Sequence, residues 1–311
     1  MYLISLFLLA KATSSCINHA TVPAPVEIWP EAESAQAELL RRGNRSYLTA
    51  SGYEVVIVSG GAGQQGEVKK FPLNNRIKPE VKVHIEAPPT GRLYEYTVTN
   101  STSSLDAIEY ISLVVPHDLG PFRVLIQESA SRSAWRPGVS VPIAMQAELH
   151  TESRGQYADW SMSVSPENKG LAPGQTASGF VIETQLKPGF TTFYAEGALP
   201  NIPDDYADLP GVDAVFISQL RWSDAHVLTI GPQFNAASTF AEVVENFKDG
   251  VNRLWDCQGP TDFLSAFRKI LDRSDSWASL RRELKNLPPA KSGGLEDDIA
   301  NAIRITAGES K

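Results

Sequence analysis

The feature that most constrains the fold is a succession of short apolar or alternating runs between Tyr47 and about Pro200. Each run is bounded by Gly, Pro, Asn or Ser, and this pattern is typical of β-strands joined by turns. The run 93–99 alternates cleanly and places Tyr94, Tyr96 and Val98 on one face. The predicted strands are 53–58, 81–85, 93–99, 111–115, 122–127, 139–145, 160–164, 179–186 and 191–195.

The connections between these runs predict how the strands pair. No segment of about 10 to 15 residues with helical period separates them, and parallel strands need such crossovers, so we expect antiparallel sheets packed as a sandwich. Pro173-Gly174 and Pro188-Gly189 suit type II turns, because Pro presets one torsion angle and Gly takes the positive one. Further strands are predicted at 214–220 and 226–230, and Gly231-Pro232 marks the end of the sandwich.

Beyond Gly231-Pro232 the spacing of apolar residues becomes three and four, which predicts four helices. Thr239 with Glu242 forms a capping box at the first helix, and Gly259-Pro260 ends it. The core-facing residues expected in this region are Phe240, Phe247, Leu254, Phe267, Ile270 and Trp277. Because Gly231-Pro232 separates these helices from the last strand, we expect them to pack mainly against one another.

The first residues indicate export. Residues 2–10 form an apolar run, too short for a membrane span of about 20 residues but typical of a secretory signal peptide. Ala10-Lys11-Ala12 resembles a cleavage site, although no Lys or Arg precedes the run, and a buried N-terminal strand or helix is the alternative. Cys16 follows small residues, so lipidation there is a further possibility that the sequence leaves open. Residues 31–42 predict a short helix within an otherwise exposed lead-in.

Composition excludes several classes of protein. Two cysteines rule out a disulfide scaffold and a cysteine-based zinc module, and Cys257 is expected to be a small buried side chain. The net charge of -8 argues against nucleic acid as the main partner. Five scattered histidines offer little material for a metal or general-base cluster, and we interpret His84 and His226 as structural.

Gly61-Ala62-Gly63-Gln64-Gln65-Gly66 has the spacing of a dinucleotide-binding fingerprint, and Glu86 stands 20 residues beyond it. That motif requires a helix after the third glycine to hold the pyrophosphate. Pro72 and Pro79 disfavour such a helix here. We therefore predict that 60–66 is a loop connecting two strands, with nucleotide binding as the alternative.

Two other groups of residues could carry chemistry. Tryptophans 135, 160 and 222 could form an aromatic platform for sugars, but we expect a core role for them. An acidic loop could hold calcium, although a solvated loop is the preferred interpretation. Its carboxylates are Asp204, Asp205, Asp208 and Asp213. The motifs at Asn44-Arg45-Ser46 and Asn100-Ser101-Thr102 match glycosylation sequons, which matter only in a eukaryotic secretory route.

Several segments resemble pieces of exported bacterial immunoglobulin-like sandwich proteins of uncharacterised function. They are Leu-Tyr-Glu-Tyr-Thr-Val-Thr-Asn at 93–100, the strand around Trp160, and Leu-Ala-Pro-Gly-Gln-Thr-Ala-Ser-Gly-Phe at 171–180. The resemblance covers about residues 50–200. It implies an immunoglobulin-like sandwich and an exported protein, and it transfers no functional residue.

The sequence thus predicts a mainly β protein, with an antiparallel immunoglobulin-like β-sandwich followed by a C-terminal α-helical region. The predicted segments are a signal peptide (1–15), a lead-in with a short helix (16–46), the sandwich (47–232) and a helical domain (239–311). We expect a non-catalytic exported or envelope protein, located outside the cell or in the cell envelope, that binds a protein or glycan or acts as a spacer. A glycan-active sandwich hydrolase and a nucleotide binder using Gly61 to Gly66 are the alternatives. No catalytic, cofactor-binding or metal-ligating residue is assigned, and membrane contact is expected only through a lipidated Cys16.

Overall fold

The computed structural model describes residues 17–19, 27–60, 66–73, 76–88, 91–116, 122–126, 135–140, 155–162, 170–197, 202–207, 209–212, 225–290 and 293–308. Its strands are β1 (Ile17–His19), β2 (Ile28–Trp29), β3 (Arg45–Thr49), β4 (Glu54–Ser59), β5 (Glu67–Pro72), β6 (Pro79–Glu86), β7 (Arg92–Asn100), β8 (Tyr110–Pro116), β9 (Phe122–Ile126), β10 (Trp135–Ser140), β11 (Gly155–Met162), β12 (Thr176–Thr184), β13 (Lys187–Glu196) and β14 (Ala225–Phe234). Its helices are α1 (Glu33–Leu39), α3 (Asp204–Ala207), α5 (Phe240–Gln258), α6 (Asp262–Arg273), α7 (Trp277–Leu284) and α8 (Leu295–Ala307).

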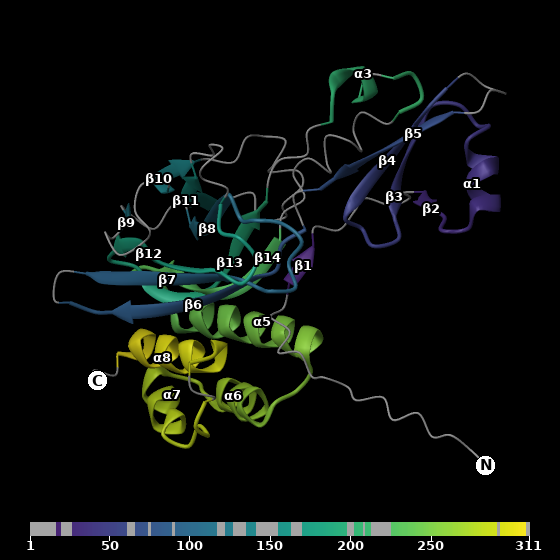
Figure 1. Cartoon of the computed structure of the whole chain (residues 1–311). Helices are drawn as coiled ribbons and strands as arrows, with labels where there is room; N and C mark the ends of the chain where they lie inside the picture. The colour runs from purple at the N-terminus through teal and green to yellow at the C-terminus, as the bar shows by residue number, and fades with distance from the viewer. Residues whose placement is uncertain are drawn as a thin grey trace, which may run out of the picture.

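Two antiparallel sheets pack face to face as a β-sandwich (Figure 1). The six-stranded sheet, here called the large sheet, has the order β1-β14-β13-β8-β11-β10. The four-stranded sheet, here called the partner sheet, has the order β6-β7-β12-β9. All strand pairs recorded within these two sheets are antiparallel, as the absence of predicted crossover helices indicated.

Aromatic side chains fill the space between the two sheets. Tyr96 of β7 packs against Trp160 and Phe193 of the large sheet, with ring centroids 6.3 Å apart in both pairs. Each polar atom among these rings has a partner: the Tyr96 hydroxyl donates to the carbonyl of Ile230, and Trp160 Nε1 donates to the carbonyl of Leu125. Burial raises the pKa of Tyr96 well above its usual range. The alternation predicted for 93–99 is therefore confirmed, because its apolar face is this core.

Two of the predicted turns have different outcomes. Pro173 and Gly174 form the predicted turn, with Gly174 at φ 82° and a 3.0 Å hydrogen bond from the Gln175 amide to the Ala172 carbonyl. Pro188-Gly189 is not a turn, because both residues lie in β13 and pair with Pro232 and Gly231 of β14. Gly231-Pro232 therefore lies inside a strand and does not end the sandwich, which corrects both predictions.

Asn100, at the end of β7, holds the loop that follows β7 against the segment around the Pro173-Gly174 turn. Its side chain is fully buried, and Nδ2 donates to the carbonyls of Asp106 and Leu171 at 2.8 Å each. The Asn100 carbonyl also accepts from the amide of Gly174. One residue thus links β7, the loop 101–109 and the segment that leads into β12.

A third sheet, here called the N-terminal sheet, has the order β2-β3-β4-β5 and lies apart from the C-terminal helices (Figure 1). We expected 53–58 in the sandwich, but it forms β4 of this sheet. One face packs against α1 through Trp29, Tyr47, Val56, Val58 and their neighbours. The other face packs against the segment around α3 through Leu48, Val55, Ile57, Leu73 and Ile202. Sequence patterns missed β3 and β5, since β3 crosses the predicted boundary at 47 and β5 is mostly polar.

The four predicted C-terminal helices are present as α5 to α8. The capping box at the start of α5 is confirmed, because the Glu242 amide donates to Thr239 Oγ1 and the Thr239 amide donates to the Glu242 carboxylate. These hydrogen bonds lower the pKa of Glu242. The predicted helix at 31–42 is confirmed as α1, Glu33–Leu39. Within the described part of the chain, no helix is long and apolar enough to cross a membrane.

The sequence predicts that the C-terminal helices pack mainly on one another, but the structure packs them on the sandwich as well. The Phe247 ring of α5 packs against Phe190 of β13 at 5.6 Å and against Phe267 of α6 at 6.0 Å. Asn246 accepts from the Phe190 amide at 2.8 Å and donates to its carbonyl at 3.0 Å. One continuous apolar cluster therefore includes sandwich and helices. The predicted boundary at 15 and the division of the chain into separate domains stay predictions.

Candidate functional site

The outer face of the large sheet carries a row of polar and aromatic side chains. The strand register places His226 of β14 beside Tyr194 of β13, Tyr194 beside Ser112 of β8, and Ser112 beside Asp159 of β11. The residues that alternate with them, such as Phe193 and Trp160, face the sandwich core. Side chains alternate between the two faces of a strand, so the row lies on the opposite face. We call His226, Tyr194, Ser112 and Asp159 the Tyr194 row.

The Tyr194 row is buried although it lies outside the sandwich core. Asp159 is 8% exposed, Ser112 is 4% exposed and Tyr194 is 3% exposed, whereas His226 is half-buried. The Tyr194 ring meets the His226 ring at 4.5 Å and the Tyr157 ring at 5.8 Å, both edge-on. Burying a carboxyl and a phenol is unfavourable unless they are hydrogen-bonded, and both of these residues have further interaction partners.

More accessible side chains border this row. Tyr110 of β8 and Glu196 of β13 are paired, face the same side and are half-buried. The amide of Glu109 donates to the carbonyl of Glu196 at 2.9 Å, which holds the two segments together. Partial burial, and to a smaller extent the nearby Asp106, raise the pKa of Glu109. The face thus combines a buried polar row with a partly exposed border that carries aromatic and acidic groups.

The strand register sets the backbone spacing of these groups. Ser112 and His226 are separated by β13, hence by two strand spacings, or about 10 Å between their backbones. Asp159 and Glu196 are also two strands apart and are offset by two residues, which adds about 7 Å along the strands.

The glycine motif connects two antiparallel strands. β4 ends at Ser59 and β5 begins at Glu67, and these two residues pair with each other. Gly66 precedes a strand and not a helix, and β6 runs antiparallel to β7. The predicted strand-connecting role of 60–66 is supported by these flanks, while residues 61–65 themselves lie outside the described residues. A helix N-terminus for a pyrophosphate does not follow Gly66.

The other candidates are dispersed. Trp135 and Trp160 are buried and pack against Phe180 at 5.1 and 5.7 Å, which confirms their core role, while Trp222 lies outside the described residues. His84 is exposed on the partner sheet, 3.5 Å from Glu86, so it is not part of a core. Cys257 is exposed near the end of α5, which corrects the expectation of a buried side chain.

The acidic loop is only partly described. Asp205 is exposed on α3, whereas Asp208 and Asp213 lie outside the described residues. Beside it, Tyr206, Leu209 and Val212 pack against the N-terminal sheet. Among the described residues, no three His, Cys, Asp or Glu side chains gather in a way that could hold a metal ion.

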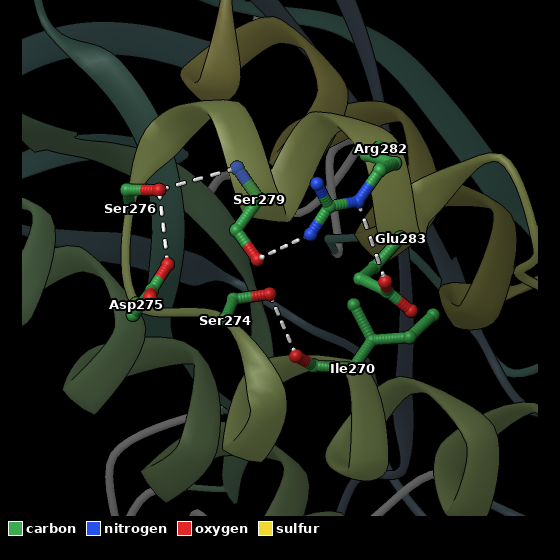
Figure 2. Close-up of polar contacts among 7 residues, drawn as sticks. All are labelled: Ile270, Ser274, Asp275, Ser276, Ser279, Arg282 and Glu283. Atoms are coloured by element: carbon green, nitrogen blue, oxygen red, sulfur yellow. Dashed lines mark hydrogen bonds and ion pairs between the residues drawn. The ribbon is translucent and has the colours of Figure 1, made fainter.

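A second polar cluster, at the corner between α6 and α7, has a structural role (Figure 2). Ser274 Oγ donates to the Ile270 carbonyl at 2.8 Å and closes the end of α6. Ser276 accepts from the Ser279 amide at 3.3 Å and caps α7. Arg282 contacts Ser279 and Glu283 on the same helix. All these contacts satisfy helix ends or neighbouring side chains, as caps do.

Sequence patterns did not single out the Tyr194 row, apart from His226. Its four members come from four strands, and only the register of the folded sheet brings them together. A signal was nevertheless present: Ser112 interrupts the apolar run of β8, and Asp159 stands between Ala158 and Trp160. A lone polar residue inside a buried strand points to a special environment.

No family model matches the chain, and no curated protein matches it. Among solved structures, an uncharacterised protein from Nocardia farcinica with an immunoglobulin-like fold is similar to it. The match covers 50% of this chain and 98% of that chain, at 15% sequence identity and a TM-score of 0.26.

Proposed function

We propose that this chain is an exported, non-catalytic binding module that holds a protein or glycan partner on the outer face of its large sheet. The observation that supports this proposal is the Tyr194 row. The sandwich has its own aromatic interior between the two sheets, and the row of Asp159, Ser112 and Tyr194 is buried on the opposite face of the large sheet. Burying such groups outside the core is costly, and polar groups in unusual surroundings are frequent at functional sites.

The chemistry of the face suits a polar partner. The half-buried Tyr110 offers a flat ring, and the half-buried Glu196 and His226 offer hydrogen-bonding groups, while Tyr157, Tyr194 and Asp159 are buried beside them. Aromatic rings of this kind combine apolar contact area with a polar atom, as recognition surfaces require.

Binding can be tested with an array of bacterial surface glycans, probed with the purified full chain and with two single-residue variants. His226→Ala removes a half-buried member of the Tyr194 row. His84→Ala removes an exposed histidine of the partner sheet and serves as the matched control. We expect His226→Ala to weaken binding at least tenfold and His84→Ala to leave it unchanged. Equal affinities for all three proteins would contradict the proposed face.

A protein partner would give a different result. The array would then show no binding, and cross-linking in envelopes of the native host would yield one defined protein whose capture depends on His226 but not on His84. Absence of binding in both assays would refute the binding function.

Export has a separate test. β1 begins at Ile17, so removal of the first 12 to 15 residues would leave every described strand complete. We expect the intact mass of protein from its native host to lack at least residues 1–12. A cytosolic protein that retains residues 2–10 would refute export.

A further inference from the structure

Helix α8 is joined to both sheets of the sandwich by side chains that bond to strand backbone. Near its C-terminus, the buried Thr306 Oγ1 donates to the Pro188 carbonyl of β13 at 2.7 Å. Near its N-terminus, the Asp298 carboxyl accepts from the Val83 amide of β6 at 3.4 Å. β6 is an edge strand of the partner sheet, so its outward amide depends on α8 for a partner.

The two attachments differ in chemistry. The threonine hydroxyl keeps its hydrogen bond at any physiological pH, whereas a carboxyl changes charge. Asp298 is half-buried beside the buried Ile299, and its carboxyl accepts a long hydrogen bond in compensation for that partial burial. Glu242, by contrast, is exposed and receives a short hydrogen bond from the Thr239 amide at 2.7 Å. An ionised carboxylate is therefore poorly supported at Asp298.

We propose that the contact between Asp298 and β6 is a pH-sensitive latch, which holds α8 on the sandwich edge in mildly acidic solution and weakens as the pH rises to neutrality. If so, the sandwich edge is most tightly closed in an acidic environment.

The charged groups around the carboxyl come from three elements. Burial is the main cause that raises the pKa of Asp298 to about 7, the neighbouring Asp297 raises it further, and the Val83 amide and Lys82 of β6 oppose the increase. Tyr96 of β7 interacts with the same carboxyl and stays neutral.

Cations on other elements packed against α8 have different partners. Arg281 of α7 donates to the Ala307 carbonyl at the opposite end of α8. Lys187 of β13 lies over the Trp277 ring, 5.9 Å from its centroid.

The direction of the effect follows from proton linkage. A free aspartate has a pKa of about 3.9, so between about pH 4 and pH 7 the docked state binds more protons than the released state. Docking therefore weakens as pH rises through this window, by at most about tenfold per pH unit. The stabilisation that the neutral Asp298 carboxyl gives to docking of α8 is fully present below about pH 4 and is lost above about pH 7.

Amide hydrogen exchange at pH 5 and pH 8, corrected for intrinsic rates, measures this latch directly in β6 and α8. In the wild-type chain, we expect protection of the Val83 amide and of the first turn of α8 to be at least tenfold lower at pH 8 than at pH 5. Asp298→Asn keeps an oxygen acceptor but cannot ionise, so its protection should not change with pH. Asp297→Asn, at the exposed neighbouring position, is the matched control: its protection should still fall with rising pH, with a midpoint slightly below that of the wild type because Asp297 no longer raises the pKa of Asp298.

Equal pH dependence in Asp298→Asn and wild type would overturn the proposal. Should Asp298→Asn fail to fold, a carboxyl-carbon NMR titration of the wild-type chain decides the question. A midpoint near 7 for Asp298 supports the latch, and a midpoint near 4 refutes it.

Discussion

The C-terminal helices and the N-terminal sheet both flank the sandwich, but they are attached to it in different ways. Buried residues of α5 to α8 belong to the same apolar cluster as the sandwich interior. The described residues of the N-terminal sheet bury their apolar side chains in two clusters of their own, one on each face. Elements that share a core unfold together, whereas elements with separate cores can unfold independently. The boundary that the sequence predicts at Gly231-Pro232 is therefore not a boundary in packing.

The largest effect is expected for Phe247→Ala. Phe247 is fully buried between Phe190 of β13 and Phe267 of α6, and removal of such a ring typically costs about 3 to 5 kcal/mol. Because the core is shared, we expect helices and sandwich to lose stability in one transition. Circular dichroism combined with limited proteolysis measures this. Digestion confined to the region after about residue 232, with an intact sandwich, would show instead that the helices form a separate unit.

Ile57→Ala tests the other half of the comparison. Ile57 is fully buried in the cluster between the N-terminal sheet and the segment around α3, and its truncation should cost about 2 to 4 kcal/mol locally. We expect early proteolysis within 27–73 while the melting of the sandwich and helices stays unchanged. A single transition shifted as a whole would show that all three sheets are coupled.

Gly250→Ala is expected to have a smaller effect of the same kind as Phe247→Ala. A Cβ atom at Gly250 would overlap the Phe190 ring, so α5 must move away from β13. Overpacking of this type costs about 1 to 3 kcal/mol. Thermal unfolding measures the loss, and Asp249→Ala on the exposed side of the same turn is the control. A Gly250→Ala chain as stable as the control would contradict the close contact between α5 and β13.

Local sequence patterns predicted the helices and strands well, but they predicted less well which of these elements pair or pack together. The capping box at Thr239 and the alternation around Tyr96 depend on neighbours in the sequence, and both are confirmed. Pro188-Gly189 matched a turn equally well, yet pairing with β14 overrides that preference. The Tyr194 row depends on the register of four strands, which no local pattern specifies.

Asn100 has a consequence for any eukaryotic host used to secrete this protein. It is the acceptor of the sequon Asn100-Ser101-Thr102, and both hydrogens of its side-chain amide are used inside the fold. A sugar chain replaces one of these hydrogens and needs open space, whereas the folded residue has no exposed surface. Glycosylation of the nascent chain at Asn100 is therefore incompatible with closure of the loop between β7 and β8. Secretion from such a host calls for Thr102→Ala, which removes the acceptor motif and leaves Asn100 in place.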